Sequence, residues 1–193
     1  MKIERPPSKQ PLPPEAKAVF KGEIFEVLQW EQELFNGTTA TFEKLRRPDT
    51  AVVIAVLPGG RILIAHQEQP GKPPFTGLLG GRVDEGEDAL TAAKRELREE
   101  SGYVSNEWTL LLSNQPISKI EWAVFIFVAR NCEKTGDQNL DAGEKISVQS
   151  VSFEEFTDLV TNGELDDPEL RIMFLEAKLD PKKMAELRQL ILG

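Results

Sequence analysis

Residues 81–103 read GRVDEGEDALTAAKRELREESGY. The stretch is rich in Ala, Leu, Glu, Lys and Arg, which are strong helix formers, and it predicts a helix over residues 87–101. Glu87 and Asp88 suit the positive N-terminal end of a helix, and Gly102 is a residue type that commonly ends one. We therefore expect one helix in the middle of the chain, with a glycine-rich segment immediately before it.

Two acidic residues of this helix lie where packing favours apolar side chains, and a third lies close to them. At about 100° per residue, Glu96 and Glu100 fall on one line beside the apolar stripe, and Glu99 lies within reach of both. Carboxylates this close repel each other, and their partial burial is costly unless a positive charge joins them. Two interpretations follow: a solvated acidic patch that pairs with Arg95, or a cation site.

The glycines before the helix favour the cation site. Gly80 and Gly81 would let main-chain carbonyl groups approach a cation held by the helix carboxylates. Carboxylate and carbonyl oxygens, without His or Cys, suit a hard cation such as Mg²⁺ or Mn²⁺. Because such sites most often act on phosphates, the sequence predicts a metal site for a phosphate compound.

Composition limits the classes of function. The 193 residues carry 23 basic and 32 acidic side chains, a net charge of −9, which argues against binding to a nucleic acid polymer. The single cysteine, Cys132, excludes an intrachain disulfide, and we expect an unreactive thiol in a reducing cytoplasm. The longest apolar runs, 51–57 and 122–129, have the length of strands, and the N-terminus lacks the apolar core of a signal peptide. We therefore expect a cytoplasmic protein without a membrane span.

The chain divides into three expected parts. Residues 1–16 are rich in proline and predict an extended arm. Residues 17–48 predict a small antiparallel β-meander that turns at Asn36-Gly37. Residues 49–193 form the main domain, which begins with a buried strand at 50–57, a turn at Pro58-Gly59-Gly60 and a hairpin partner at 61–67. Residues 68–86 hold many glycines and prolines and predict a shaped loop without strands.

Strands and helices also alternate after the central helix. We expect strands near 108–112, 121–130 and 145–151, then helices near 153–160, 169–178 and 181–191. The last helix has Asp180 as its N-cap and Pro181 at its first position. Strands around one central helix, with further helices at the end, predict a mixed α/β layered fold.

The spacing of residues 81–103 resembles the Nudix box, G-x5-E-x7-R-E-U-x-E-E-x-G-U, in which U is usually aliphatic. Gly81, Glu87 and the run Arg95-Glu96-Leu97-Arg98-Glu99-Glu100-Ser101-Gly102 fill its fixed positions, and Tyr103 occupies the last one. The resemblance to the Nudix hydrolase family implies an α/β/α sandwich with a mixed sheet, here preceded by the N-terminal antiparallel β-meander. It also implies that residues 49–193 are a catalytic domain that hydrolyses a nucleoside diphosphate linked to another group.

The same resemblance implies the roles of the box residues. Glu96, Glu99 and Glu100 would be metal ligands, with the carbonyl of Gly80 as a further one. Arg95 would orient the glutamates, and Glu87 would assist the metal site or brace the loop. The implied cofactor is Mg²⁺, or Mn²⁺, which would polarise the diphosphate and lower the pKa of the attacking water.

The meander and its Phe35-Asn36-Gly37 turn are similar to those of the ADP-ribose and nucleoside diphosphate sugar pyrophosphatases. This implies a nucleoside diphosphate sugar as substrate, cut to a nucleoside monophosphate and a sugar phosphate, and a homodimer built through residues 18–47. The chain departs from that branch at Gln67-Glu68-Gln69, where an aromatic residue and Arg often follow the first Gln. Two alternatives stay open: a nucleotide-binding sensor without catalysis, and a nucleoside triphosphate pyrophosphatase.

Other candidate site residues lie outside the box. Arg46, Arg47 and Gln69 are candidate substrate contacts. In the resembled branch a Glu from a later loop often activates the water, and the matching residues 136–145 carry Asp141 and Glu144. We prefer Glu144, which borders the next strand, and keep Asp141 or Glu99 as alternatives. We expect a structural role for His66, and packing roles for Trp30, Trp108 and Trp122.

Overall fold

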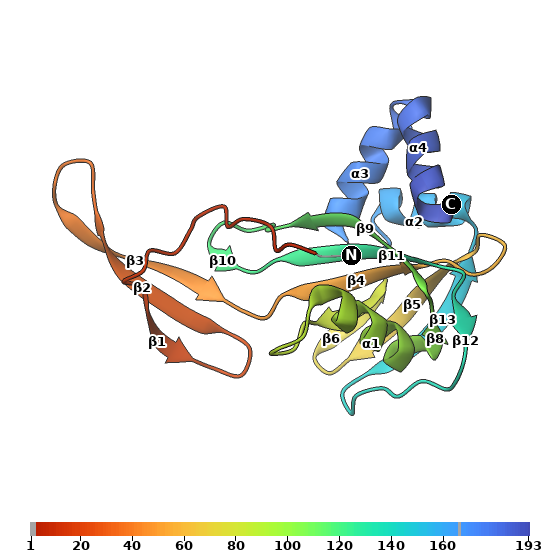
Figure 1. Ribbon diagram of the computed structural model, residues 1–193, viewed down its shortest axis with the longest axis horizontal. Coiled ribbons are helices and arrows are strands. Elements are labelled where there is room, and N and C mark those ends of the chain that lie inside the picture. The colour runs from red at the N-terminus through yellow and green to blue at the C-terminus, as the bar shows by residue number, and fades with distance from the viewer. Residues whose placement is uncertain (1–2, 166) are drawn as a thin grey trace.

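The computed structural model describes residues 3–165 and 167–193 and has three layers. In Figure 1 the central strands lie between one helix on one side and three helices on the other. The single helix is α1 (Ala89–Ser101), and the three are α2 (Phe153–Asn162), α3 (Pro168–Lys178) and α4 (Pro181–Leu192). This arrangement confirms the predicted α/β/α sandwich.

Two sheets make up the middle layer. The first is mixed and has the order β7 (Leu79–Arg82), β4 (Thr50–Ala55), β11 (Val124–Arg130) and β9 (Glu107–Asn114). In it β4 and β11 are parallel, and the two outer strands are antiparallel to them. The second sheet is antiparallel and has the order β13 (Lys145–Val151), β5 (Ile62–Gln69) and β6 (Lys72–Gly77). The short strands β8 (Tyr103–Val104) and β12 (Glu133–Lys134) pair beside them.

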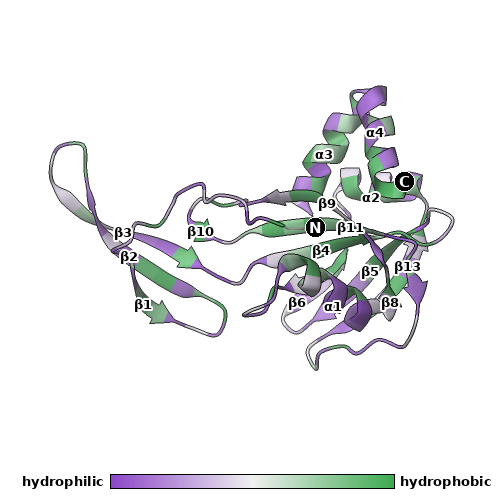
Figure 2. Cartoon of the chain, in the orientation of Figure 1, coloured by the Kyte–Doolittle hydropathy of each residue, from purple (hydrophilic) through white to green (hydrophobic). Residues whose placement is uncertain are grey.

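Strand β4 contributes to both hydrophobic cores because its two faces are apolar. Ala51 and Val53 pack in the core that includes α1, whereas Ile54 packs in the core that includes α2, α3 and α4. Figure 2 shows hydrophobic residues concentrated in β4 and β11. Strands buried on both faces read as continuous apolar runs, which is why residues 50–57 were recognisable in the sequence.

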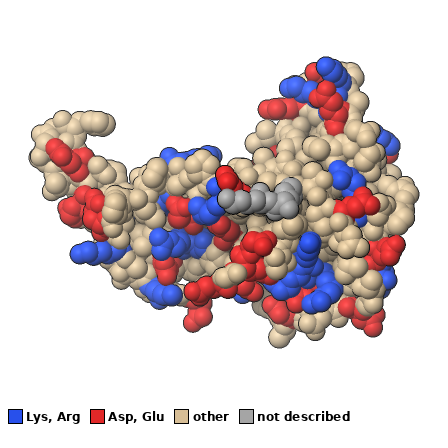
Figure 3. Space-filling view, in the orientation of Figure 1, with Lys and Arg blue, Asp and Glu red and all other residues tan. Residues whose placement is uncertain are grey.

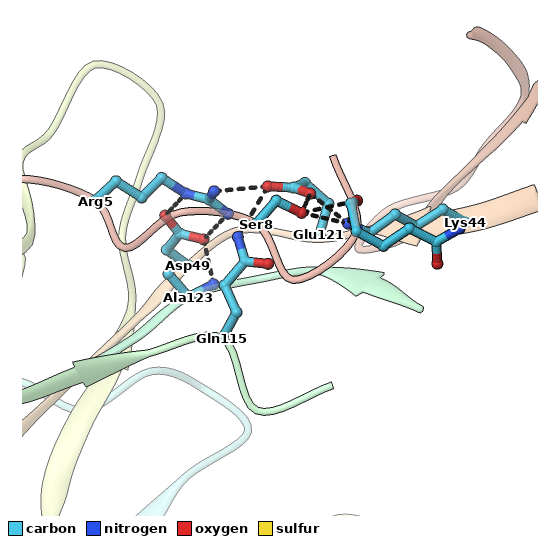
Figure 4. Close-up of polar contacts among 8 residues, drawn as sticks. Arg5, Ser8, Lys44, Asp49, Gln115, Glu121 and Ala123 are labelled. Atoms are coloured by element: carbon cyan, nitrogen blue, oxygen red, sulfur yellow. Dashed lines mark hydrogen bonds and ion pairs between the residues drawn. The ribbon is translucent and has the colours of Figure 1, made fainter. Parts of the chain in front are cut away.

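The N-terminal meander extends away from the sandwich, at the left of Figure 1. It has the order β1 (Lys17–Lys21), β2 (Glu26–Glu33), β3 (Thr39–Arg46) and β10 (Ile120–Glu121), and the predicted turn at Asn36-Gly37 joins β2 to β3. Residues 3–16 form neither helix nor strand and contain only turns and bends. Arg5 and Ser8 of this arm donate hydrogen bonds to the carboxylate of Glu121 in β10 (Figure 4). The arm thus contacts the place where the meander meets the sandwich.

The structure corrects two predictions about strands, one on pairing and one on boundaries. The predicted hairpin of 50–57 with 61–67 is present only next to its turn: Val56, the residue after β4, forms one antiparallel bridge with Ile62, and β5 then pairs with β13 and β6. Strand β4 already pairs on both edges, with β7 and β11, so it has no free edge for β5. The predicted strand 121–130 is two strands, because β10 pairs with β3 of the meander and β11 pairs with β4.

The predicted loop at 68–86 is also wrong, since it contains β6 and β7. Strand β6 tolerates Pro73 and Pro74 because it lies at the edge of its sheet and because both prolines fall in an irregular stretch where neither has a register partner in β5. Strand β7 requires glycine instead. A Cβ on Gly80, whose φ is +145°, would collide with the carbonyl oxygen of Ala51 in β4. Glycine here permits a close approach of two backbones, not a turn.

Candidate functional site

Helix α1 begins two residues later than predicted. Asp88 is its N-cap and accepts hydrogen bonds from the main-chain N–H groups of Leu90 and Thr91 at 3.0 and 2.9 Å. Glu87 therefore lies outside the helix. Gly102 ends the helix as predicted, in the left-handed conformation with φ of +75°.

Arg95 connects the helix to the loop before it. Its guanidinium donates two hydrogen bonds to the carboxylate of Glu87, at 3.2 and 3.0 Å, and one to the carbonyl of Arg82 at 2.9 Å. It also donates to Glu96 at 2.8 Å and to Glu99 at 3.2 Å. Of the two roles implied for Glu87, the contacts favour bracing the loop, because its carboxylate is fully engaged by Arg95 and by the N–H of Asp84.

Glu100 is the most deeply buried of the helix acids, with 4% of its surface exposed. Its carboxylate accepts a hydrogen bond from the N–H of Gly80 at 2.6 Å. Burial raises its pKa to about 8, and the nearby carboxylates of Glu96 and Glu144 add to the effect against the opposing hydrogen bond from Gly80. Glu100 therefore lies where its ionised form is disfavoured unless a cation binds beside it.

Glu96 lies against the second glycine of β7. A Cβ on Gly81 would collide with the carboxylate of Glu96, so the glycine leaves the space that this carboxylate fills. Burial raises the pKa of Glu96, although its ion pair with Arg95 opposes the shift. Glycine at residue 81 thus matters for the position of an acidic side chain.

These residues surround one polar cavity of about 270 Å³, which we call the carboxylate cavity. It is lined by Gln69, Gly80, Gly81, Arg82, Asp84, Arg95, Glu96, Glu99, Glu100, Asn139, Leu140, Asp141 and Glu144. The structure therefore brings together the helix acids, Arg95, Gly80 and both candidate bases of the later loop, Asp141 and Glu144. The solvated acidic patch paired with Arg95 does not describe this arrangement, because Glu100 is buried and faces Gly80.

The two candidate bases of the later loop, Asp141 and Glu144, differ in their surroundings. Glu144 is half-buried, and its charge contributes to the raised pKa of both Glu96 and Glu100. Asp141 is exposed, and its main-chain carbonyl accepts the N–H of Glu144 at 3.0 Å. Glu144 is accordingly the loop acid that lies in electrostatic contact with the helix acids.

The three candidate substrate contacts lie in different places. Gln69 lines the cavity. Arg47 stacks over the ring of Trp122, with 4.7 Å to the ring centroid. Burial lowers the pKa of Arg47, and the nearby positive charge of Arg82 lowers it further. Arg46 is exposed and donates to Glu26 of the meander at 3.3 Å, so the structure does not bring it to the cavity.

Some cavity residues had no role in the sequence prediction. Arg82 and Asp84 occupy variable positions of residues 81–103, and Asn139 and Leu140 lie in the later loop. Only their closeness to recognised residues could have indicated them. His66, by contrast, contacts Thr76 at 3.1 Å and Gln149 at 3.2 Å, beside a different cavity of about 700 Å³.

The remaining residues singled out in the sequence have packing roles. Cys132 is buried, and burial raises the pKa of its thiol to about 11, so it is unreactive at neutral pH. Trp30 packs against Phe42 with ring centroids 6.0 Å apart, and Trp108 packs against Phe127 at 6.2 Å. No helix in the described residues is both long and apolar enough to cross a membrane.

The donor chemistry of the cavity fits a hard divalent cation. Its side-chain oxygen donors are carboxylates and the amides of Gln69 and Asn139, and its glycines admit main-chain oxygens. Within residues 3–165 and 167–193, no three His, Cys, Asp or Glu side chains are already gathered around a common point. Two of the acids are engaged by Arg95, and Glu100 is engaged by the N–H of Gly80. A cation would compete with these contacts and would offset the mutual repulsion of the carboxylates.

Comparison with known proteins shows the family of the chain. The NUDIX domain family matches residues 46–172. The chain is 27% identical over 166 residues to the ADP-ribose pyrophosphatase of Bacillus subtilis (strain 168), with 83% of this chain and 89% of that protein covered. It is 28% identical over 141 residues to the methanol dehydrogenase activator of Bacillus methanolicus, with 71% and 76% covered.

A solved structure also resembles the chain. The crystal structure of an ADP compounds hydrolase superposes with a TM-score of 0.69 at 20% identity, and the match covers 91% of this chain and 97% of that one. This likeness shows the fold. The family match spans more than half of the chain and includes every residue that lines the carboxylate cavity. The chain therefore belongs to the Nudix family.

Proposed function

We propose that this protein is a metal-dependent pyrophosphatase that hydrolyses a nucleoside diphosphate sugar, ADP-ribose or a close analogue, to a nucleoside monophosphate and a sugar phosphate. One observation carries the proposal: Glu96, Glu99, Glu100 and Glu144 line a single cavity in a chain of the Nudix family. The name of the Bacillus subtilis relative, an ADP-ribose pyrophosphatase, supports the choice of substrate.

Mg²⁺ or Mn²⁺ is the proposed cofactor, held by Glu96, Glu99 and Glu100 with the carbonyl of Gly80. When bound, it would polarise the diphosphate and lower the pKa of the attacking water. The surrounding protein groups have separate tasks. Arg95 orients the glutamates that it contacts, and Glu144 accepts the proton of the water.

The proposed substrate contacts follow from position and charge. Gln69 lines the cavity and offers an amide donor to a phosphate oxygen. Arg47 offers a cation beside Arg82, which lines the same cavity. Arg46 would reach a phosphate only after leaving Glu26, so we give it the smallest part.

A panel of substrates tests the proposal. Purified protein is incubated with Mg²⁺ or Mn²⁺ and with ADP-ribose, GDP-mannose or a nucleoside triphosphate, and the products are separated by anion-exchange chromatography. The proposal expects AMP and ribose 5-phosphate from ADP-ribose. Faster cleavage of triphosphates than of diphosphate sugars would favour the triphosphate pyrophosphatase, and tight binding without products would favour the sensor.

We further propose a homodimer formed through residues 18–47 and a location in the cytoplasm. The meander is a small sheet with exposed apolar side chains, among them Val19, Phe20, Ile24 and Phe25. Small sheets with such faces are marginal alone and gain stability from a partner.

Figure 3 shows acidic and basic side chains interspersed on the visible face of the molecule, which suits a small-molecule partner better than a polymer of one charge.

A further inference from the structure

The loop after β12 is attached to the end of helix α1 by main-chain hydrogen bonds. The N–H groups of Thr135 and Gly136 donate to the carbonyl of Gly102 at 2.9 and 3.3 Å, and the N–H of Asn139 donates to the carbonyl of Glu99 at 2.8 Å. The last carbonyls of a helix have no partner within the helix, so these contacts satisfy groups that would otherwise need water. The first half of the loop thereby acts as a cap on α1.

The side chain of Gln138 adds a connection of a different kind. Its Nε2 donates to the carbonyl of Glu100, and also to the carbonyl of Ile146 in β13 at 3.0 Å. One amide group thus uses both of its N–H donors to join two elements. Glutamine suits this task because it carries two donors on one nitrogen at the end of a side chain.

Both carbonyls bound by Gln138 belong to the neighbourhood of the cavity acids. Glu100 itself lines the cavity, and Ile146 follows Glu144 by two residues. The loop between Gln138 and Ile146 contains Asn139, Asp141 and Glu144, and all three line the cavity. The spacing between the helix acids and Glu144 therefore depends on a segment that Gln138 closes at both ends.

We propose that Gln138 is a positioning residue: its amide, by joining the main chain at Glu100 to the main chain at Ile146, sets the place of Glu144 relative to the helix acids. This inference rests on the proposed function, because it assigns Glu144 a task in the hydrolysis. A reacting group that moves by about 1 Å can lose a hundredfold in rate, whereas substrate binding depends on other contacts.

The test replaces the two donors without changing the length of the side chain. Gln138→Met keeps the reach of glutamine and removes its N–H groups. Because Gln138 is exposed, the variant should fold, with a melting temperature close to that of the wild type. With Mg²⁺ and ADP-ribose, kcat should fall ten- to a hundredfold and KM should stay within threefold.

A second readout does not depend on activity. Amide hydrogen exchange in residues 139–146, measured by mass spectrometry on the protein without substrate, should be faster in Gln138→Met than in the wild type. Asp137→Ala is the matched control, since it changes the neighbouring side chain of the same loop and leaves the Gln138 contacts in place. Its kcat and its exchange should equal those of the wild type.

The outcomes separate this inference from the proposed function. An unchanged kcat or an unchanged exchange rate in Gln138→Met overturns the inference, as does a fall in kcat that Asp137→Ala shares. If the wild type cleaves none of the substrates, the proposed function fails, and the exchange measurement alone then decides whether Gln138 holds this segment.

Discussion

At the scale of single residues, Glu100 shows how a helix can carry an acid where packing would favour an apolar group. It lies on the buried side of α1, and the N–H of Gly80 is its hydrogen-bond donor. The helical period alone predicted that Glu100 and Glu96 share this side. The period did not predict the contacts of Arg95 with Glu87 and with the carbonyl of Arg82, because Glu87 lies in the loop before the helix and Arg82 ends β7.

Replacement of Glu100 by glutamine should separate activity from stability. Glu100→Gln keeps the shape of the side chain and removes a charge that is disfavoured by burial and by Glu96 and Glu144. We expect hydrolysis of ADP-ribose to fall at least a hundredfold, while the melting temperature of the metal-free protein stays equal or rises. Activity assays and differential scanning calorimetry check the two halves. Glu96→Gln should behave alike, and a loss of cooperative melting would instead indicate a structural role.

The identity of the water-activating base can be tested by a pair of variants. Glu144 is the loop acid that interacts electrostatically with Glu96 and Glu100, and we expect Glu144→Gln to lower kcat by about a hundredfold or more. Its melting temperature should change little, because Glu144 is only half-buried. If Glu144→Gln keeps nearly wild-type turnover while Glu99→Gln loses several orders of magnitude, the base lies on the helix.

At the scale of elements, the junction between meander and sandwich depends on one carboxylate (Figure 4). Glu121 accepts hydrogen bonds from Lys44 at 2.6 Å, Arg5 at 2.6 Å and Ser8 at 2.8 Å. The Lys44 side chain is fully buried, so Glu121 neutralises a charge that has no access to water. Burial alone would raise the pKa of Glu121, but these donors, together with Gln115, lower it to about 2.

Glu121→Gln should therefore destabilise the protein in a pH-dependent way. A carboxylate whose folded pKa lies below its ordinary value stabilises the fold above that ordinary value and stops doing so as the pH falls toward 2. At pH 7 we expect a loss of about 3 kcal/mol, because the variant leaves Lys44 buried without a counter-charge. Denaturant unfolding should show this difference shrinking to less than half by about pH 3.

The exposed pair of Glu154 and Arg188 provides the control for this measurement. Glu154 is 67% exposed, so Glu154→Gln should leave the unfolding midpoint almost unchanged across the same pH range. A pH-independent difference between the wild type and Glu121→Gln would contradict the assignment of the stabilisation to the ionised carboxylate.

The elements also show what the sequence could predict. Helices α1 to α4 were predicted within two residues at every end, since signals such as Gly102 after α1 and Asp180-Pro181 before α4 are local. The pairing of β2 with β3 was predicted from the Asn36-Gly37 turn, but that of β4 with β11 was not, because β11 lies more than sixty residues later in the chain. Strands β6 and β7 were missed for a related reason: Pro73, Pro74 and Gly80 look like loop residues until the edge position of β6 and the approach of β4 are known.

At the scale of the whole molecule, the meander is the part through which we expect two chains to associate. It projects from the sandwich and exposes Phe20, with 59% of its surface accessible, and Val19, with 55%. We expect a homodimer through residues 18–47, and light scattering at micromolar concentration should give twice the chain mass of 21.6 kDa. Phe20→Glu should lower that mass toward the monomer, because it places a charge on the apolar face. A wild-type monomer would count against the dimer.

The central claim is that the carboxylate cavity cleaves a diphosphate with the aid of a divalent cation. The most direct measurement follows AMP release from ADP-ribose by the wild type and by Glu100→Gln, each with Mg²⁺ and with EDTA. We predict AMP and ribose 5-phosphate in equal amounts for the wild type with Mg²⁺, no product from either protein with EDTA, and a rate at least a hundredfold lower for Glu100→Gln with Mg²⁺. Cleavage that survives EDTA, or that Glu100→Gln retains in full, would contradict the claim.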